Sequence, residues 1–130
     1  MFSSSVFSYA NVLTKAADAS WLREQTISNN IANVDTPEYK RQDVDFEGIL
    51  EAELGMSKYE TLDSKIKNIH LNHLNARTYV DSANYSYRRD YNNVDIDTES
   101  MELASEQIRY QGLTSSISQE ISRLKTAAKV

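Results

Sequence analysis

Two histidines, His70 and His73, are the residues whose type and spacing most readily suggest a chemical site. With the nearby acids Asp63 and Asp81 they could supply two imidazole nitrogens and a carboxylate to a zinc ion. The pattern lacks the H-E-x-x-H spacing and the general-base glutamate of zinc hydrolases. We therefore expect ordinary polar positions and no metal, which makes a zinc hydrolase the least favoured interpretation.

The other patterns that could carry catalysis or nucleic-acid binding are weak. Serines are plentiful, but neither a G-x-S-x-G elbow nor a glycine-rich phosphate loop occurs. The absence of cysteine excludes disulfides and thiol nucleophiles. Arg88 and Arg89 stand among tyrosines, as on a base-stacking surface, but a net charge of −5 argues against nucleic acid. We expect no catalytic residue, cofactor, small-molecule substrate or nucleic-acid partner.

The stretch from Ser28 to Lys40, with the sequence SNNIANVDTPEYK, is different in kind. Side chains of Asn and Asp can hydrogen-bond the backbone groups that are left free where a helix ends. Pro37, the only proline, disfavours helical geometry at Thr36, so it is expected to end a helix and to fix the exit direction. Ile31 and Val34 can anchor this corner in a packed interface.

The residues before this corner predict a helix from about Ser8 to Asn33. The segment contains no glycine or proline and is rich in Ala, Leu, Gln and Glu. Its apolar residues fit helical spacing with gaps. They are Tyr9, Leu13, Ala16, Ala17, Trp21, Ile27 and Ile31.

The C-terminal segment predicts a longer helix, from about 95 to 128. Asp95 or Asp97 can cap its start, and the acids of its first turns and the basic residues of its later turns complement the helix dipole. Gly112 should cost this helix roughly 1 kcal/mol relative to alanine. A narrow coiled-coil seam follows one face. The seam consists of Leu103, Tyr110, Leu113, Ile117, Ile121 and Leu124, with Ala128 beside it.

The length of this second helix has a structural consequence. At 1.5 Å per residue it is roughly 50 Å long, whereas a compact protein of 130 residues is roughly 35 Å across. Its seam must therefore pair with the N-terminal helix, and the pair must project. The mean hydropathy of −0.58 also argues against a large self-sufficient core, and no apolar run approaches the length of a membrane span. Self-assembly is the simplest interpretation.

Residues 35–93 form a middle segment between an N-terminal region, 1–34, and a C-terminal region, 94–130. Residues 35–60 hold eight acidic and three basic residues, a net charge of −5. This charge indicates either a face exposed to solvent or a surface that is electrostatically complementary to a basic neighbour. Alternating residues predict extended chain from Lys40 to Phe46.

Two further elements are expected in the middle segment. A helical turn or two is expected from Phe46 to Leu54, and a short strand or hairpin from Thr78 to Tyr91. The expected fold class is mainly α, with two long terminal helices packed as an antiparallel coiled-coil pair and joined by an extended, partly β middle segment.

The corner resembles the N-terminal signature of the flagellar axial proteins, the rod, hook and hook-associated families, which runs approximately N-N-I-A-N-x-x-T-P-G-Y-K. Glu38 stands where that pattern has glycine. Because a left-handed conformation would be strained for Glu, we expect the turn after Pro37 to differ from the family's. The matching residues, which form the candidate assembly motif, are Asn29, Asn30, Ile31, Ala32, Asn33, Thr36, Pro37, Tyr39 and Lys40.

Further stretches narrow the resemblance to the proximal-rod branch of this family. They are residues 41–46, residues 94–104 with 107–111, and the ending 121–127. The resemblance implies a structural subunit of the proximal rod of the flagellar basal body, the drive shaft and export conduit, which assembles through its terminal helices.

The resemblance also implies the partners and the location. The partners are other copies of the chain, other rod proteins, and FliE, the MS ring and the export gate at the proximal end. The location is the rod in the periplasmic space, reached through the flagellar type III apparatus. The N-terminus agrees, because it lacks the basic and apolar regions of a Sec signal peptide. The alternative is a soluble coiled-coil adaptor or export chaperone that binds a partner helix, which explains the seam but not the Asn-rich corner.

Overall fold

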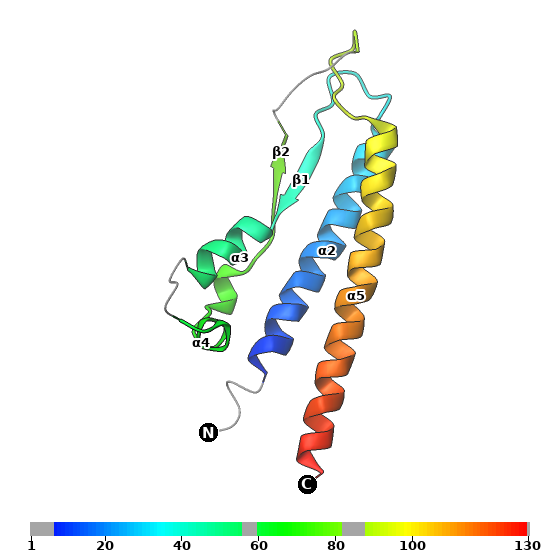
Figure 1. The fold of residues 1–130 in the computed structure, drawn as a ribbon. Coiled ribbons are helices and arrows are strands. Elements are labelled where there is room, and N and C mark those ends of the chain that lie inside the picture. The colour runs from blue at the N-terminus through cyan, green and yellow to red at the C-terminus, as the bar shows by residue number, and fades with distance from the viewer. Residues whose placement is uncertain (1–6, 56–59, 82–87, 130) are drawn as a thin grey trace.

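The computed structural model describes residues 7–55, 60–81 and 88–129. Two long helices dominate it, α2 over Ser8–Ala32 and α5 over Ile96–Ala128. They lie side by side and run in opposite directions, so the start of α2 and the end of α5 share one end of an elongated molecule (Figure 1). With 33 residues α5 is roughly 50 Å long. The mainly helical fold with paired terminal helices is confirmed.

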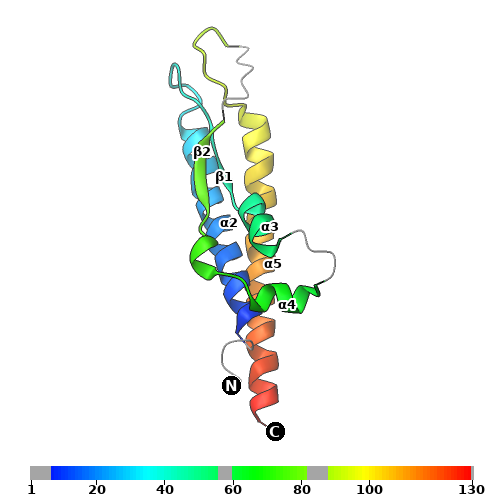
Figure 2. The same ribbon diagram turned by 90° about the vertical axis from the view of Figure 1, so that its left-hand side faces the viewer.

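In its described residues, 35–55, 60–81 and 88–93, the middle segment contains two short strands and three short helical elements. In chain order these are β1 (Gln42–Asp45), α3 (Glu47–Leu54), α4 (Leu62–Lys67), a 3-10 turn (Leu71–His73) and β2 (Arg77–Val80). The strands form an antiparallel pair with Asp43 opposite Tyr79. The two views show this segment on one side of the helix pair (Figures 1 and 2).

Most of the elements expected in the middle segment are present. The extended stretch before Phe46 and the helix after it are confirmed, whereas α4 and the 3-10 turn were not expected. The strand expected near Thr78 is β2, but its partner is β1 rather than a neighbouring part of the same stretch. Residues 82–87 of the expected hairpin lie outside the described residues.

The apolar core lies between α2 and the middle segment rather than between the two long helices. The expected seam on α5 is only half buried, and Ile121 is 43% exposed. The most buried residues of α5 are instead two acids, Glu99 and Glu106. The core cluster consists of Val12, Ala19, Phe46, Ile66 and Leu74. Within the described ranges, no helix combines the length and the apolar character needed to cross a membrane.

Candidate functional site

Helix α2 ends at Ala32, five residues before Pro37, so the proline does not itself stop the helix as expected. Asn33 ends it. Its backbone N–H donates to the carbonyl oxygen of Asn29 at 3.1 Å, and its side-chain Nδ2 donates to the same oxygen at 2.8 Å. Thr36 Oγ1 then donates to Asn33 Oδ1 at 3.1 Å. The expectation that Asn side chains bond the free backbone at this end is confirmed.

Asn92, in the segment that leads into α5, holds the turn in place. Its side chain is 1% exposed, and Nδ2 donates to the carbonyl oxygens of Asn33, Val34 and Thr36 at 2.8, 3.0 and 2.8 Å. Its Oδ1 accepts from the backbone N–H of Val94 at 2.8 Å. One buried amide therefore ties the end of the first long helix to the start of the second.

Glu38 adopts the backbone conformation that glycine favours, with φ of 61°. Its N–H donates to the carbonyl oxygen of Asp90 at 2.7 Å, which holds the turn against the segment before α5. The left-handed region costs a residue with a Cβ roughly 1–2 kcal/mol. We expected Glu38 to avoid the left-handed conformation, and this prediction is wrong. Glu38 adopts that conformation in spite of the strain.

Asn30 is the centre of the corner. It is fully buried. Its Nδ2 donates to the backbone carbonyl oxygen of Gln42 at 2.8 Å, and its Oδ1 accepts from the backbone N–H of Gln42 at 2.9 Å. The side-chain amide thus bonds the backbone of Gln42 in the way that a neighbouring strand does. Oδ1 also accepts from the Tyr39 hydroxyl at 3.1 Å, and Nδ2 donates to Glu99 Oε2 at 3.1 Å. This one side chain joins α2, the outer edge of β1 and α5.

A first buried ion pair stands beside Asn30. Arg41 Nε donates to Glu99 Oε1 at 2.7 Å and Nη1 donates to Asp81 Oδ2 at 2.6 Å. Glu99 is 1% exposed, so its side-chain oxygens depend on these partners for hydrogen bonds in place of water. Burial opposes the charge of Arg41, but the bonds to Glu99 and Asp81 outweigh it and raise the pKa of the guanidinium.

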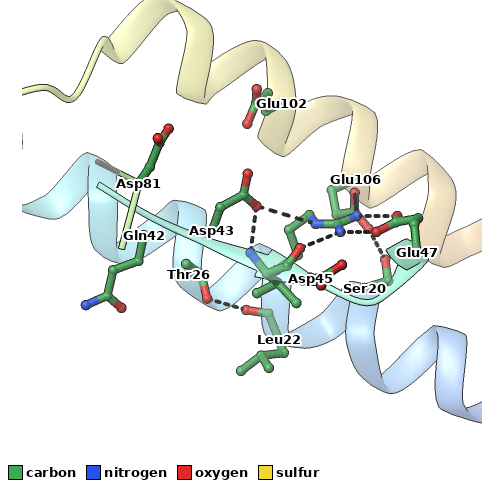
Figure 3. A network of polar contacts seen from close by, with 12 residues as sticks. Ser20, Leu22, Thr26, Gln42, Asp43, Asp45, Glu47, Asp81, Glu102 and Glu106 are labelled. Atoms are coloured by element: carbon green, nitrogen blue, oxygen red, sulfur yellow. Dashed lines mark hydrogen bonds and ion pairs between the residues drawn. The ribbon is translucent and has the colours of Figure 1, made fainter. Parts of the chain in front are cut away.

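A second group of ion pairs lies further along the helices and includes the exposed Glu47 and the buried Glu106 (Figure 3). Arg23 of α2 donates to Glu47 at 2.9 and 2.6 Å and to the Val44 carbonyl at 2.8 Å, and it lies 3.5 Å from Glu106. Ser20 Oγ donates to Glu106 Oε1 at 2.6 Å. Hydrogen bonding to Arg23 lowers the pKa of Glu47 to about 2. Polar contacts from Arg23 and Ser20 to Glu106 therefore contribute to the interface between the long helices.

The nine residues of the candidate motif divide into two groups. Asn30, Asn33 and Tyr39 take part in the hydrogen bonds described above, and Ile31 is half buried. The other five are exposed, although Thr36 Oγ1 donates to Asn33 Oδ1 and Lys40 Nζ donates to the Tyr91 carbonyl. They are Asn29, Ala32, Thr36, Pro37 and Lys40.

The two histidines do not converge on the acids that were considered with them. His73 Nδ1 lies 2.9 Å from Glu53 Oε1, whereas Asp63 accepts from Tyr9 and Asp81 from Arg41. No cluster of three or more His, Asp or Glu residues within the described part of the chain is placed to hold a metal ion.

Sequence reasoning missed the charged partners at the interface. From the sequence, Glu99 and Glu106 were interpreted as acids of the first turns of the helix, where a negative charge complements the helix dipole. Their spacing of seven residues, on the face that also carries Leu103 and Tyr110, was the signal that they point inward. Nothing comparable marks Asn92, because it lies outside any periodic segment.

Comparisons with known proteins agree with this arrangement. The family model described as flagella basal body rod protein matches residues 11–40, from α2 through the corner. The flagellar basal body rod protein FlgB of Bacillus subtilis (strain 168) is 34% identical over 127 residues, which covers 97% of this chain and 94% of that protein. FlgB of Borreliella burgdorferi is 36% identical, with 72% and 75% covered, and FlgB of Buchnera aphidicola is 30% identical, with 82% and 84% covered. The chain belongs to the FlgB family of flagellar basal body rod proteins.

Proposed function

We propose that this chain is a structural subunit of the proximal rod, part of the drive shaft and export conduit, and that it assembles through its two terminal helices. The observation that carries the proposal is the corner, where Asn30 joins α2 to β1 and α5, and Asn92 ties the end of α2 to the segment that leads into α5. Membership in a family of structural rod proteins also confirms that the chain is not an enzyme.

The division of the motif supports a specific role for each part. Inward side chains such as Asn30 and Tyr39 fold the corner within one subunit. Exposed residues such as Asn29, Ala32 and Pro37 are not used in this way by the described contacts and are available to neighbours. In this proposal the inward residues fix the shape of the corner, and the exposed residues on that corner contact neighbouring subunits.

The proposed partners are other copies, other rod proteins, and FliE, the MS ring and the export gate at the proximal end. The proposed route is export through the flagellar type III apparatus without a Sec signal. Support comes from the likeness to FlgB proteins over nearly the whole chain and from a two-helix pair that the described part of the middle segment covers on one side.

The direct test is mass spectrometry of hook–basal bodies purified from the native cell. Peptides of this chain in fixed ratio to other rod proteins support the axial subunit. Absence from intact basal bodies, with the chain in the cytosol as a finite complex, would favour the coiled-coil adaptor or export chaperone instead.

A variant in the α5 seam tests the role of the terminal helices. Ile117 is half buried and lies one heptad after Tyr110, whose ring is 6.0 Å from that of Trp21 on α2, so Ile117→Asp places a charge on the face of α5 that meets α2. We expect export to continue and rod assembly to fail, measured as secreted protein and as basal bodies seen by electron microscopy. Gln107→Asp, on an exposed side of the same helix, is the matched control. Normal motility of the Ile117 variant would remove the seam from the proposal.

A further inference from the structure

The strand pair has two edges, and the outer edge of β1 is closed by side chains, two of which come from α2. Both backbone groups of Gln42 bond to the side-chain amide of Asn30. The carbonyl of Val44 accepts from Arg23 Nη2 at 2.8 Å, and its N–H donates to the side chain of Asp43. The backbone groups that β1 directs away from β2 are therefore all occupied within the chain.

The outer edge of β2, in contrast, is open. Gln42 lies opposite Val80, and Val44 lies opposite Thr78. In an antiparallel pair, two opposite residues direct their backbone groups either toward each other or both outward. The N–H and carbonyl groups of Thr78 and Val80 therefore point outward, and no hydrogen bond of the described residues uses them. All of β2 is exposed, and β1 lies between β2 and the helix pair (Figure 1).

An open edge of this kind can pair with a further strand. Proline and bulges are common devices against such pairing, but β2 contains no proline and its register with β1 is continuous. Tyr79 and Val80 are 49% and 54% exposed, so an added strand also removes apolar surface from water. The edge is suited to one more strand, and its side chains determine which strand fits.

The charged side chains on one face of the strand pair alternate in sign from strand to strand. Arg41 Nη1 forms an ion pair at 2.6 Å with Asp81, whose N–H donates to the Arg41 carbonyl. Arg77 lies opposite Asp45 on the same face, and its guanidinium forms no ion pair with a described residue. Arg77 is therefore a positive charge at the open edge that is available to a carboxylate from another chain.

Along the edge, this face carries a positive, a neutral and a negative side chain in turn. They are Arg77, Tyr79 and Asp81. Such an order is complementary to itself when it is read in the opposite direction, because the positive end then meets the negative end. Opposite charges that face each other across two strands stabilise their pairing, whereas like charges oppose it.

We propose that β2 pairs antiparallel with β2 of a second copy of this chain, with Tyr79 opposite Tyr79. In this register Thr78 of each copy exchanges both backbone hydrogen bonds with Val80 of the other. Arg77 of each copy lies opposite Asp81 of the other, and a carboxylate that already accepts from Arg41 can accept a further bond. A shift by two residues would place Arg77 or Asp81 opposite Tyr79 and lose the charge pairs.

This contact closes on itself. Both copies use the same surface, so the contact has a two-fold axis at Tyr79 and produces a dimer. A closed dimer does not extend along a rod, and the contact therefore belongs to the free chain before incorporation. There it covers a strand edge that would otherwise be open to unspecific pairing. The inference goes beyond the rod function and does not depend on it.

Disulfide cross-linking of the purified chain tests the register, because the natural chain contains no cysteine. The two Tyr79 Cα atoms would lie about 4.5 Å apart, within the range that a disulfide spans. The two Val80 Cα atoms would lie roughly 8 Å apart, beyond that range, so Val80→Cys is the matched exposed control. We expect Tyr79→Cys to give at least tenfold more covalent dimer on oxidation than Val80→Cys. Equal yields, or a higher yield from Val80→Cys, would overturn the proposal.

Two further variants, each combined with Tyr79→Cys, test the edge itself. The Val80 N–H points outward, so Val80→Pro removes a donor of the proposed contact without removing a bond between β1 and β2. Circular dichroism should be unchanged, and the yield of covalent dimer should fall at least tenfold. Arg77→Glu leaves the backbone as it is and brings two carboxylates together across the contact, so it should lower the yield at least fivefold. An undiminished yield from Arg77→Glu, or from folded Val80→Pro, would show that the copies do not meet at this edge.

Discussion

Replacing Asn30 with alanine removes four hydrogen bonds from the corner. Two of them end on the backbone of Gln42, one on the Tyr39 hydroxyl and one on the Glu99 carboxylate. A neutral bond contributes about 1 kcal/mol and one to a charged group somewhat more, for a total of roughly 4–5 kcal/mol. Water can reach Gln42 and Tyr39 once the amide is gone, which reduces the expected loss to about 3 kcal/mol.

Urea unfolding measures this loss directly. Trp21 is the only tryptophan and lies 6.0 Å from the ring of Tyr110 on α5, so its fluorescence reports the separation of the long helices, while circular dichroism reports helix content. In a thermal scan the same loss lowers the unfolding midpoint by roughly 10 °C. Asn30→Asp should cost more than alanine, because it places a second carboxylate beside Glu99.

The adjacent residue provides the control. Asn29 is exposed, and its side chain makes no hydrogen bond among the described contacts, so Asn29→Ala should change the free energy of unfolding by less than about 0.5 kcal/mol. If Asn30→Ala stays within that range as well, the corner is not held by the network described here, and the reasoning is refuted.

Three further outcomes follow from the same geometry. Glu38→Gly should raise the free energy of unfolding by about 1 kcal/mol in urea titrations, because it relieves the positive φ; a loss of stability would contradict this account. A double-mutant cycle of Arg41→Met and Glu99→Gln should give a coupling of at least about 1.5 kcal/mol, and additive single effects would count against the buried pair. The pKa of Glu47 in the folded chain is about 2 because of its bonds to Arg23, below the ordinary value of 4.5 for a glutamate. The stabilisation from ionised Glu47 is therefore fully present above about pH 4.5 and is lost as the pH falls toward 2. In thermal scans, Glu47→Gln should make the unfolding midpoint depend less on pH between pH 4.5 and pH 2.

The long helices could be predicted because their signals are local. Spacing, capping and length placed α2 and α5 within one residue of their observed bounds. Asp95 caps α5 as expected, since its side chain accepts from the N–H of Asp97. The short strand β1 and helix α3 also followed from alternation and from a short apolar run.

The contacts that fix the corner could not be predicted, because they join residues far apart in the sequence. The bond from Asn92 to Val34 and the pair of Arg41 with Glu99 depend on how the chain returns to the corner. The same holds for β2, whose strand partner lies more than thirty residues earlier. Helix α4 is six residues long, too short for a periodic signal to stand out.

The buried acids of α5 determine how the two long helices respond to force. Glu99 and Glu106 are one heptad apart, about 10 Å along the helix axis. A slip of α5 by one heptad would bring Glu106 to the position opposite Arg41 but leave Leu113 where Glu106 meets Arg23. Only one axial alignment therefore satisfies both arginines. Arg23 lies on α2 and Arg41 directly before β1, so sliding α5 along its axis against these two segments must break both ion pairs together, whereas peeling α5 away from one end breaks them in turn.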